Sequence, residues 1–96
     1  MIYELEFKDS ALKEWRKLDN SIKELFKKRL AERLDAPIVE SARLTGLPDC
    51  YKIKLRAAGY RLVYQVFDDL VLVMVIAVGK RENNLVYRNV KDRILK

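Results

Sequence analysis

The stretch Cys50–Val66 constrains the fold more than any other part of the chain. Its sequence, CYKIKLRAAGYRLVYQV, alternates apolar with cationic residues over Tyr51–Arg56, which is the pattern of a β-strand with one buried face. Ala57–Gly59 supplies turn residues, and Tyr60–Val66 has the composition of a returning strand. The stretch therefore predicts a β-hairpin with one apolar and one cationic face, and no Asp or Glu within it neutralises the cations.

The register of this hairpin follows from matching apolar residues across it, because a slip of one residue would turn every side chain to the other face. Burying the apolar side chains together pairs Leu55 with Leu62 and Ile53 with Tyr64. The cationic face then has Arg56 opposite Arg61, Lys54 opposite Val63 and Lys52 opposite Gln65. Like charges that face each other cost stability, so this face either binds an anion or is simply a solvated surface.

The charge balance favours a negatively charged partner. The 96 residues include 20 Lys and Arg against 14 Asp and Glu, a net charge of +6. Such an excess is typical of proteins that bind nucleic acid or, as a second choice, an acidic protein. The N-terminus lacks the pattern of a signal peptide, and the longest apolar run, Leu70–Val78, is too short to cross a bilayer. We therefore expect a cytoplasmic protein that does not contact membranes.

The residue types that the chain lacks exclude several kinds of active site. Without histidine there is no Ser-His or Cys-His relay and no histidine pair for acid–base catalysis. Cys50 is the single cysteine, the carboxylates form no metal-ligand pattern, and three glycines make no glycine-rich phosphate loop. We therefore expect neither a metal nor a cofactor.

Lysine, arginine and tyrosine remain, and they suit metal-free chemistry on a phosphodiester. Fixed Arg and Lys donors stabilise the negative charge that builds up when phosphorus is attacked. Clustered cations lower one another's pKa, so one lysine of a cluster can act as a base. On RNA the adjacent 2′-hydroxyl is a built-in nucleophile that the protein needs only to align.

The remaining patterns predict a small α+β domain. Ile2–Phe7 alternates as a first strand, Asp9 or Ser10 can cap a first helix, and the capping box Ser21–Glu24 begins a second helix. Leu70–Val78 is apolar on both faces, as in the innermost strand of a sheet. A last helix, capped by Asn83 or Asn84, carries Val86, Val90 and Ile94 on one face. The order β-α-α-β-β-β-α predicts one domain over residues 1–96, with a mainly antiparallel sheet, an N-terminal helical hairpin on one side and a C-terminal helix.

Three segments carry a specific likeness. ALKEWRKL at Ala11–Leu18, the run from Leu44 to Val66 and VGKRENNLVY at Val78–Tyr87 resemble the RelE toxins of bacterial toxin–antitoxin modules, and the resemblance covers essentially the whole chain. It implies a ribosome-dependent endoribonuclease that cuts mRNA in the ribosomal A site by 2′-hydroxyl attack and leaves a 2′,3′-cyclic phosphate. It also implies inhibition by a RelB-like antitoxin, in a complex that binds operator DNA and represses its own operon.

The resemblance also implies roles for five residues of this sequence. Lys52 and Lys54 match the family's strand lysines, the candidates for base and phosphate contact, although the sequence does not say whether Lys52, Lys54 or Tyr87 takes the proton. Arg61 matches the arginine that stabilises the transition state. Arg81 matches the arginine proposed to protonate the leaving oxygen. Tyr87 matches the tyrosine that orients the 2′-hydroxyl and stacks on a base, a role suited to an exposed aromatic side chain on RNA.

One position departs from the family pattern. Thr45 stands where the family motif has an arginine just before Gly46, so we do not count Thr45 as catalytic. Arg43 shares a face with Thr45 if this segment is extended, and would then reach the same phosphate. We expect contacts with RNA or the ribosome from the other basic residues of the cationic surface: Lys27, Lys28, Arg29, Arg33, Arg43, Arg56 and Lys80.

Two other functions fit the same residues. A ParE-like toxin shares the RelE fold but inhibits DNA gyrase without cutting RNA. A basic module could also bind RNA or an acidic protein without catalysis, and for Lys27, Lys28, Arg29 and Arg33 a merely solvated helix face is a further alternative.

Overall fold

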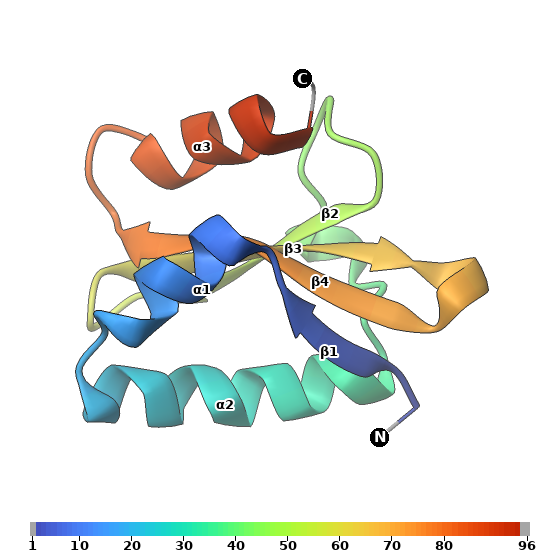
Figure 1. Cartoon of the computed structure of the whole chain (residues 1–96), viewed down its shortest axis with the longest axis horizontal. Coiled ribbons are helices and arrows are strands. Elements are labelled where there is room, and N and C mark those ends of the chain that lie inside the picture. The colour runs from blue at the N-terminus through green and yellow to red at the C-terminus, as the bar shows by residue number, and fades with distance from the viewer. Residues whose placement is uncertain (1, 95–96) are drawn as a thin grey trace.

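Four strands form one sheet in the computed structural model, which describes residues 2–94 (Figure 1). Their spatial order is β1 (Glu4–Phe7), β4 (Leu72–Lys80), β3 (Tyr60–Phe67) and β2 (Cys50–Leu55). β1 runs parallel to β4, and the other two pairs are antiparallel, so the sheet is mixed. The central position of β4, expected from its two apolar faces, is confirmed.

Helices cover both faces of the sheet (Figure 1). α2 (Asn20–Asp35) lies on one face and α3 (Leu85–Ile94) on the other, while α1 (Asp9–Arg16) lies along β4 beyond the end of β1. Two short 3-10 turns, Glu40–Ala42 and Asp68–Leu70, complete the chain. The α+β class and the predicted order of helices and strands are confirmed. Within residues 2–94, no helix has the length and apolar character needed to span a membrane.

The two faces of the sheet build two apolar cores. The core on the α2 side also takes in Ala11 of α1, and its largest members include Phe26, Leu30, Ile53, Leu62 and Tyr64. The core on the α3 side contains Cys50, Val63, Ile76, Ala77, Val86 and Val90. A bulge in β4 turns both Ile76 and Ala77 towards α3, and it returns Val78 to the α2 side.

The predicted hairpin register is wrong by two positions, although the predicted faces are right. Ile53 pairs with Leu62 and Lys54 with Arg61, instead of Ile53 with Tyr64 and Lys54 with Val63. The turn causes the shift: Gly59 adopts a φ of +72° and donates its N–H to the Leu55 carbonyl at 2.8 Å. The turn therefore occupies residues 56–59 and removes Arg56 from the strand. A shift of two residues leaves each side chain on its face.

The cap predicted at Asp9 or Ser10 and the capping box predicted at Ser21–Glu24 are also wrong. α1 begins at Asp9 itself, and the residue before it, Lys8, makes no side-chain hydrogen bond to the helix. α2 begins one residue before the predicted box, at Asn20, and the residue before it, Asp19, makes no side-chain hydrogen bond to the helix. The Lys23 N–H already bonds to the Asp19 carbonyl at 3.0 Å, so Ser21 lies inside the first turn.

Candidate functional site

The hairpin places three cationic side chains on the α3 side of the sheet. Lys54 and Arg61 are direct cross-strand partners, and Lys52 lies opposite Val63, a member of the α3-side core. All three residues are half-buried. The cationic face expected from the alternation therefore exists, and it is turned towards α3.

Tyr87 joins this group from α3. The guanidinium carbon of Arg61 lies 5.6 Å from the centre of the Tyr87 ring, within the range of a cation–π contact. On β4 the residue opposite Arg61 is Gly79, which has no side chain to separate the arginine from the helix. The pair consequently forms one wall of the site, with a cation beside a half-buried aromatic ring.

Arg81 reaches the site from the end of β4. Its backbone N–H donates to the Gly59 carbonyl at 2.8 Å, which ties the segment after β4 to the turn of the hairpin. This contact holds an exposed arginine beside the hairpin turn, where Arg81 lines a small pocket together with Arg61 and Tyr87.

The pKa of Lys54 records how closely the cations gather. It lies below the ordinary value of 10.5, and the largest cause is the charge of Lys52, followed by Arg61, partial burial, Arg56 and Arg81. A lowered pKa increases the fraction of neutral lysine, the form that can accept a proton. Arg56, predicted as an RNA contact, thus belongs electrostatically with the predicted catalytic residues.

Carboxylates do not neutralise this cluster. None of the five predicted catalytic residues forms an ion pair within the described part of the chain, where the ion pairs join Lys27 to Glu24, Arg43 to Glu40 and Arg93 to Glu14. Across residues 2–94, no three Asp, Glu, Cys or His side chains lie together as a metal site would need. The cluster can therefore offer its charges to an anion from outside.

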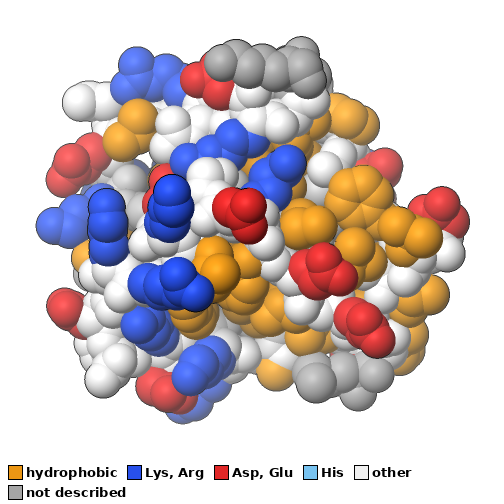
Figure 2. Space-filling model, viewed as in Figure 1, with side chains coloured by type: hydrophobic (Ala, Val, Ile, Leu, Met, Phe, Trp, Pro, Cys, Tyr) orange, Lys and Arg blue, Asp and Glu red, His pale blue; other side chains and the backbone are white. Residues whose placement is uncertain are grey.

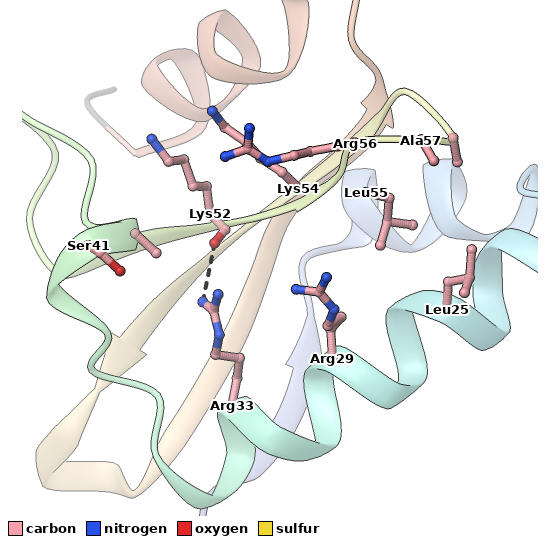
Figure 3. Close-up of a pocket in the computed structure, with 11 residues that line it drawn as sticks. Leu25, Arg29, Arg33, Ser41, Lys52, Lys54, Leu55, Arg56 and Ala57 are labelled. Atoms are coloured by element: carbon pink, nitrogen blue, oxygen red, sulfur yellow. Dashed lines mark hydrogen bonds between the residues drawn. The ribbon is translucent and has the colours of Figure 1, made fainter.

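A pocket of about 460 Å³ opens at the free edge of β2, beside the cluster. Figure 3 shows Lys52, Lys54 and Arg56 pointing to one side of this strand, with Arg29 and Arg33 rising from α2 on the other. Arg33 donates to the Lys52 carbonyl at 3.2 Å and to the Tyr64 hydroxyl at 2.8 Å. Tyr64 was predicted only as a core residue. Its predicted burial could have revealed this hydrogen bond, because a buried tyrosine hydroxyl needs a partner.

Arg43 is not brought to the cluster. Its guanidinium makes two hydrogen bonds of 2.9 Å to the Glu40 carboxylate and lies 4.9 Å from the centre of the Tyr51 ring. Tyr51 belongs to the core on the α2 side, the face opposite Lys54. The structure therefore directs Arg43 away from the place where it could stand in for the arginine missing at Thr45.

The other predicted RNA contacts lie on the surface. Lys27 and Lys28 are exposed on α2, and Lys80 is exposed at the end of β4. In Figure 2, Lys and Arg side chains gather on one half of the visible face, while hydrophobic and acidic side chains occupy most of the other half. The charge of the molecule is thus unevenly distributed.

Comparison with known proteins gives a consistent family. Residues 5–85 match the model of the family described as "ParE toxin of type II toxin-antitoxin system, parDE". The mRNA interferase toxin RelE of Escherichia coli K12 is 57% identical over 95 residues, covering 99% of this chain and 100% of that protein.

Solved structures agree with the sequence relatives. A mutant of E. coli toxin RelE in the free state is 55% identical and superimposes with a TM-score of 0.90, covering 98% of this chain and 99% of that chain. The intact E. coli RelBE toxin–antitoxin complex contains a chain 58% identical, with a TM-score of 0.81, covering 84% of this chain and 99% of that one. The protein therefore belongs to the RelE/ParE family of toxins of type II toxin–antitoxin systems.

Proposed function

We propose that this protein is an endoribonuclease toxin that cuts mRNA on the ribosome. The observation that carries the proposal is the convergence on Lys54 of Lys52, Arg61, Arg56 and Arg81, with Tyr87 packed against Arg61. A metal-free phosphoryl transfer needs such a set: a base, fixed cations and an aromatic surface for a nucleobase. The 57% identity to an mRNA interferase over the full chain supports the same reaction.

The geometry suggests how the groups share the work. Neutral Lys54 takes the proton of the 2′-hydroxyl, whose oxygen then attacks the adjacent phosphorus. Arg61, together with Lys52, stabilises the charge on the non-bridging oxygens. The P–O5′ bond breaks, and Arg81 supplies the proton to the leaving oxygen. The products are a 2′,3′-cyclic phosphate and a 5′-hydroxyl, while Tyr87 holds a base by stacking.

Two partners complete the proposal. The ribosome would hold the mRNA in line for attack in its A site, with the exposed Lys27 and Lys28 near ribosomal RNA, which puts the site of action in the cytoplasm. A RelB-like antitoxin would bind and silence the toxin, as the E. coli RelBE complex suggests, and the pair would repress its operon at operator DNA.

Primer extension on a translated mRNA tests the reaction. Purified protein added to ribosomes stalled on a defined codon should create new 5′ ends within that codon, and the same mRNA without ribosomes should be cut poorly. The absence of new ends with active ribosomes would contradict the proposal.

A second candidate function has one observation in its favour, which is that the matching family model is described as ParE. A ParE-like protein would inhibit DNA gyrase without needing a gathered set of phosphate-binding cations. Gyrase supercoiling assays with and without the protein distinguish the two: inhibition without RNA cleavage would favour the ParE-like function.

A further inference from the structure

Arg33 makes a set of contacts that the proposed reaction does not use. It lies on α2, on the side of the sheet opposite the cationic cluster, and its Nη1 donates both to the Lys52 carbonyl and to the Tyr64 hydroxyl. Tyr64 in turn donates to the Pro37 carbonyl at 2.7 Å. A single guanidinium therefore connects α2 directly to β2 (Figure 3) and, through the Tyr64 hydroxyl, to β3 and the segment after α2.

The strand that Arg33 holds is an edge strand. Along its length β2 pairs only with β3, and among the described residues its outer edge has one further backbone pairing, an isolated antiparallel bridge between Tyr51 and Arg43. The Cys50 carbonyl on this edge accepts the Leu44 N–H at 2.9 Å, and Arg33 satisfies the Lys52 carbonyl two residues further along. Arg33 thus supplies a side-chain donor to the Lys52 carbonyl, next to the bridge at Tyr51 and at the first of the two lysines predicted to be catalytic.

Tyr64 makes this attachment rigid. Its side chain is fully buried and its ring stacks on that of Tyr51 at 5.6 Å between centres. Tyr51 is the β2 residue before Lys52. Arg33 therefore holds β2 in two ways: directly, by its hydrogen bond to the Lys52 carbonyl, and indirectly, through Tyr64 of the neighbouring strand β3, whose ring stacks on Tyr51.

We propose that Arg33 is a positioning residue for Lys52 and Lys54: by holding the free edge of β2 from the α2 side, it fixes where these lysines emerge on the α3 side. This inference rests on the proposed function. It differs from the ribosome-binding role expected from the sequence, because Arg33 acts through the backbone of β2 and its guanidinium is engaged within the protein.

The neighbouring Arg29 supplies a matched control. It lies one turn earlier on α2, lines the same pocket and is exposed, and within residues 2–94 it makes no hydrogen bond or ion pair. Arg29→Met and Arg33→Met therefore remove the same charge from the same pocket, but only the second releases the edge of β2.

Single-turnover cleavage on programmed ribosomes provides the first test. Arg33→Met should lower the rate at saturating ribosomes by about tenfold, as displacement of reacting groups does, with the half-saturating ribosome concentration and its salt dependence unchanged. Arg33→Lys should recover part of the rate, because one ammonium can reach the carbonyl or the hydroxyl. A wild-type rate at saturation, or a raised half-saturating concentration with a smaller salt slope, would show that Arg33 is dispensable or contacts the ribosome.

A titration of the lysine side chains by NMR in the free protein provides a second test that needs no cleavage. Lys54 faces Lys52 on its own strand, Arg56 in the turn, Arg61 on β3 and Arg81 after β4, and Arg61 in turn lies over the Tyr87 ring of α3. If Arg33 holds Lys52 in place, the pKa of Lys54 should rise in Arg33→Met, return partly in Arg33→Lys and stay unchanged in Arg29→Met. An unchanged titration in Arg33→Met would overturn the proposal.

A second variant and the lysine titration distinguish a failure of this inference from a variant that does not fold and from a failure of the proposed function. Should Arg33→Met fail to fold, Tyr64→Phe keeps the ring and removes the hydroxyl, and it should shift the Lys54 titration in the same direction by less; no shift would count against the proposal. If the wild-type protein cuts no RNA, the proposed function fails, while the titration still decides whether Arg33 positions the lysines.

Discussion

At the scale of single residues, Lys54 has surroundings in which a lysine can act as a base without histidine or metal. Every strong neighbour of its ammonium that the structure records is another cation, and Lys52, two residues away on the same face, contributes most to lowering its pKa. Protonated Lys54 repels these neighbours, so release of its proton relieves the repulsion. The negative charge of an incoming phosphate would partly neutralise the other cations around Lys54.

The pH dependence of cleavage follows from this environment. If Lys54 is the base, as proposed, its active form is neutral, and the single-turnover rate should rise with pH, with an inflection below the ordinary lysine value of 10.5. Lys52→Met removes the largest cause of the lowered pKa, and the rising limb should therefore move to higher pH. Lys13→Met, an exposed change on α1, is the control. A limb that stays in place in Lys52→Met would show that another group titrates.

Arg61 should be needed for the reaction but not for folding. Arg61→Ala removes a fixed donor and the cation beside Tyr87, and we expect cleavage to fall by about 10²-fold or more. The side chain is half-buried and makes no ion pair within the described residues, so thermal unfolding should change little. Arg88→Ala, on the exposed face of α3 next to Tyr87, serves as the control and should cleave like the wild type.

Sequence patterns predicted only part of the set of cationic side chains that the fold brings together. Alternation in the hairpin correctly put Lys52, Lys54 and Arg61 on one face, because period-two patterns depend only on parity. Arg43 could not be placed in this way, since its direction depends on the 3-10 turn that brings Glu40 under its guanidinium. Arg33 was assigned to the surface because helical spacing does not reveal an acceptor on a distant strand.

At the scale of helices and strands, the hairpin turn determines which cations face each other. Apolar matching favoured Leu55 opposite Leu62, but the left-handed Gly59 closes the turn one residue earlier and makes Lys54 the partner of Arg61. Turn geometry is a backbone property, and side-chain hydrophobicity carries little information about it. The error mattered chemically, because the true register pairs two predicted catalytic residues.

Gly59→Ala should destabilise the protein through backbone strain alone. The φ of +72° is unfavourable for a residue with a Cβ, while no atom lies within 4 Å of the place that the Cβ would take. We expect the free energy of unfolding in urea to fall by about 1 kcal/mol. Gly79→Ala is the control, because its φ is ordinary and its Cβ would only touch Val86 at 3.5 Å. Equal effects of the two changes would contradict this explanation.

β1 pairs with β4 only as far as Val75, and beyond this point side chains from two different helices bond to the β4 backbone. Beyond the end of β1, the Val78 N–H donates to Glu14 of α1 at 3.3 Å, and Arg93 of α3 donates to the Ile76 carbonyl at 2.7 Å. Arg93 and Glu14 also form an ion pair at 2.9 Å, with both side chains mostly buried. This pair joins α1 to α3 around the side of the sheet, and neither residue was predicted to do so.

Arg93→Met should therefore destabilise the fold. It leaves Oε2 of Glu14 and the Ile76 carbonyl without a donor in a partly buried place, while Oε1 of Glu14 keeps only the Val78 N–H, and this should lower the free energy of unfolding by about 1–3 kcal/mol in urea. Arg88→Met removes an exposed arginine from the same helix and should change stability by less than about 0.5 kcal/mol. An Arg93→Met protein as stable as the Arg88→Met control would mean that the pair contributes nothing.

At the scale of the whole molecule, the positively charged side chains assigned to chemistry and to docking form two separate groups. The cations around Lys54 are half-buried between the sheet and α3 or lie at the ends of strands, whereas Lys27 and Lys28 project from α2 on the far side of the sheet. Charges at the reacting phosphate act on the transition state, while exposed charges at a distance act on the approach to RNA through counterion release. If both proposed roles hold, the fold separates chemistry from docking by putting the two groups of cations on opposite faces of the sheet.

Replacing both Lys27 and Lys28 by Gln should affect docking alone. If each contacts one phosphate of ribosomal RNA, the slope of log affinity against log salt should become less steep by about 1.4–1.8, with weaker binding at low salt. The cleavage rate at saturating ribosomes should stay at the wild-type level, because neither ammonium lies near Lys54 in the fold. A fall in the saturated rate would connect α2 to the chemistry. An unchanged salt slope would mean that other exposed cations form the docking surface. Lys80 at the end of β4 would then be the next residue to replace, because it precedes Arg81 of the predicted catalytic set.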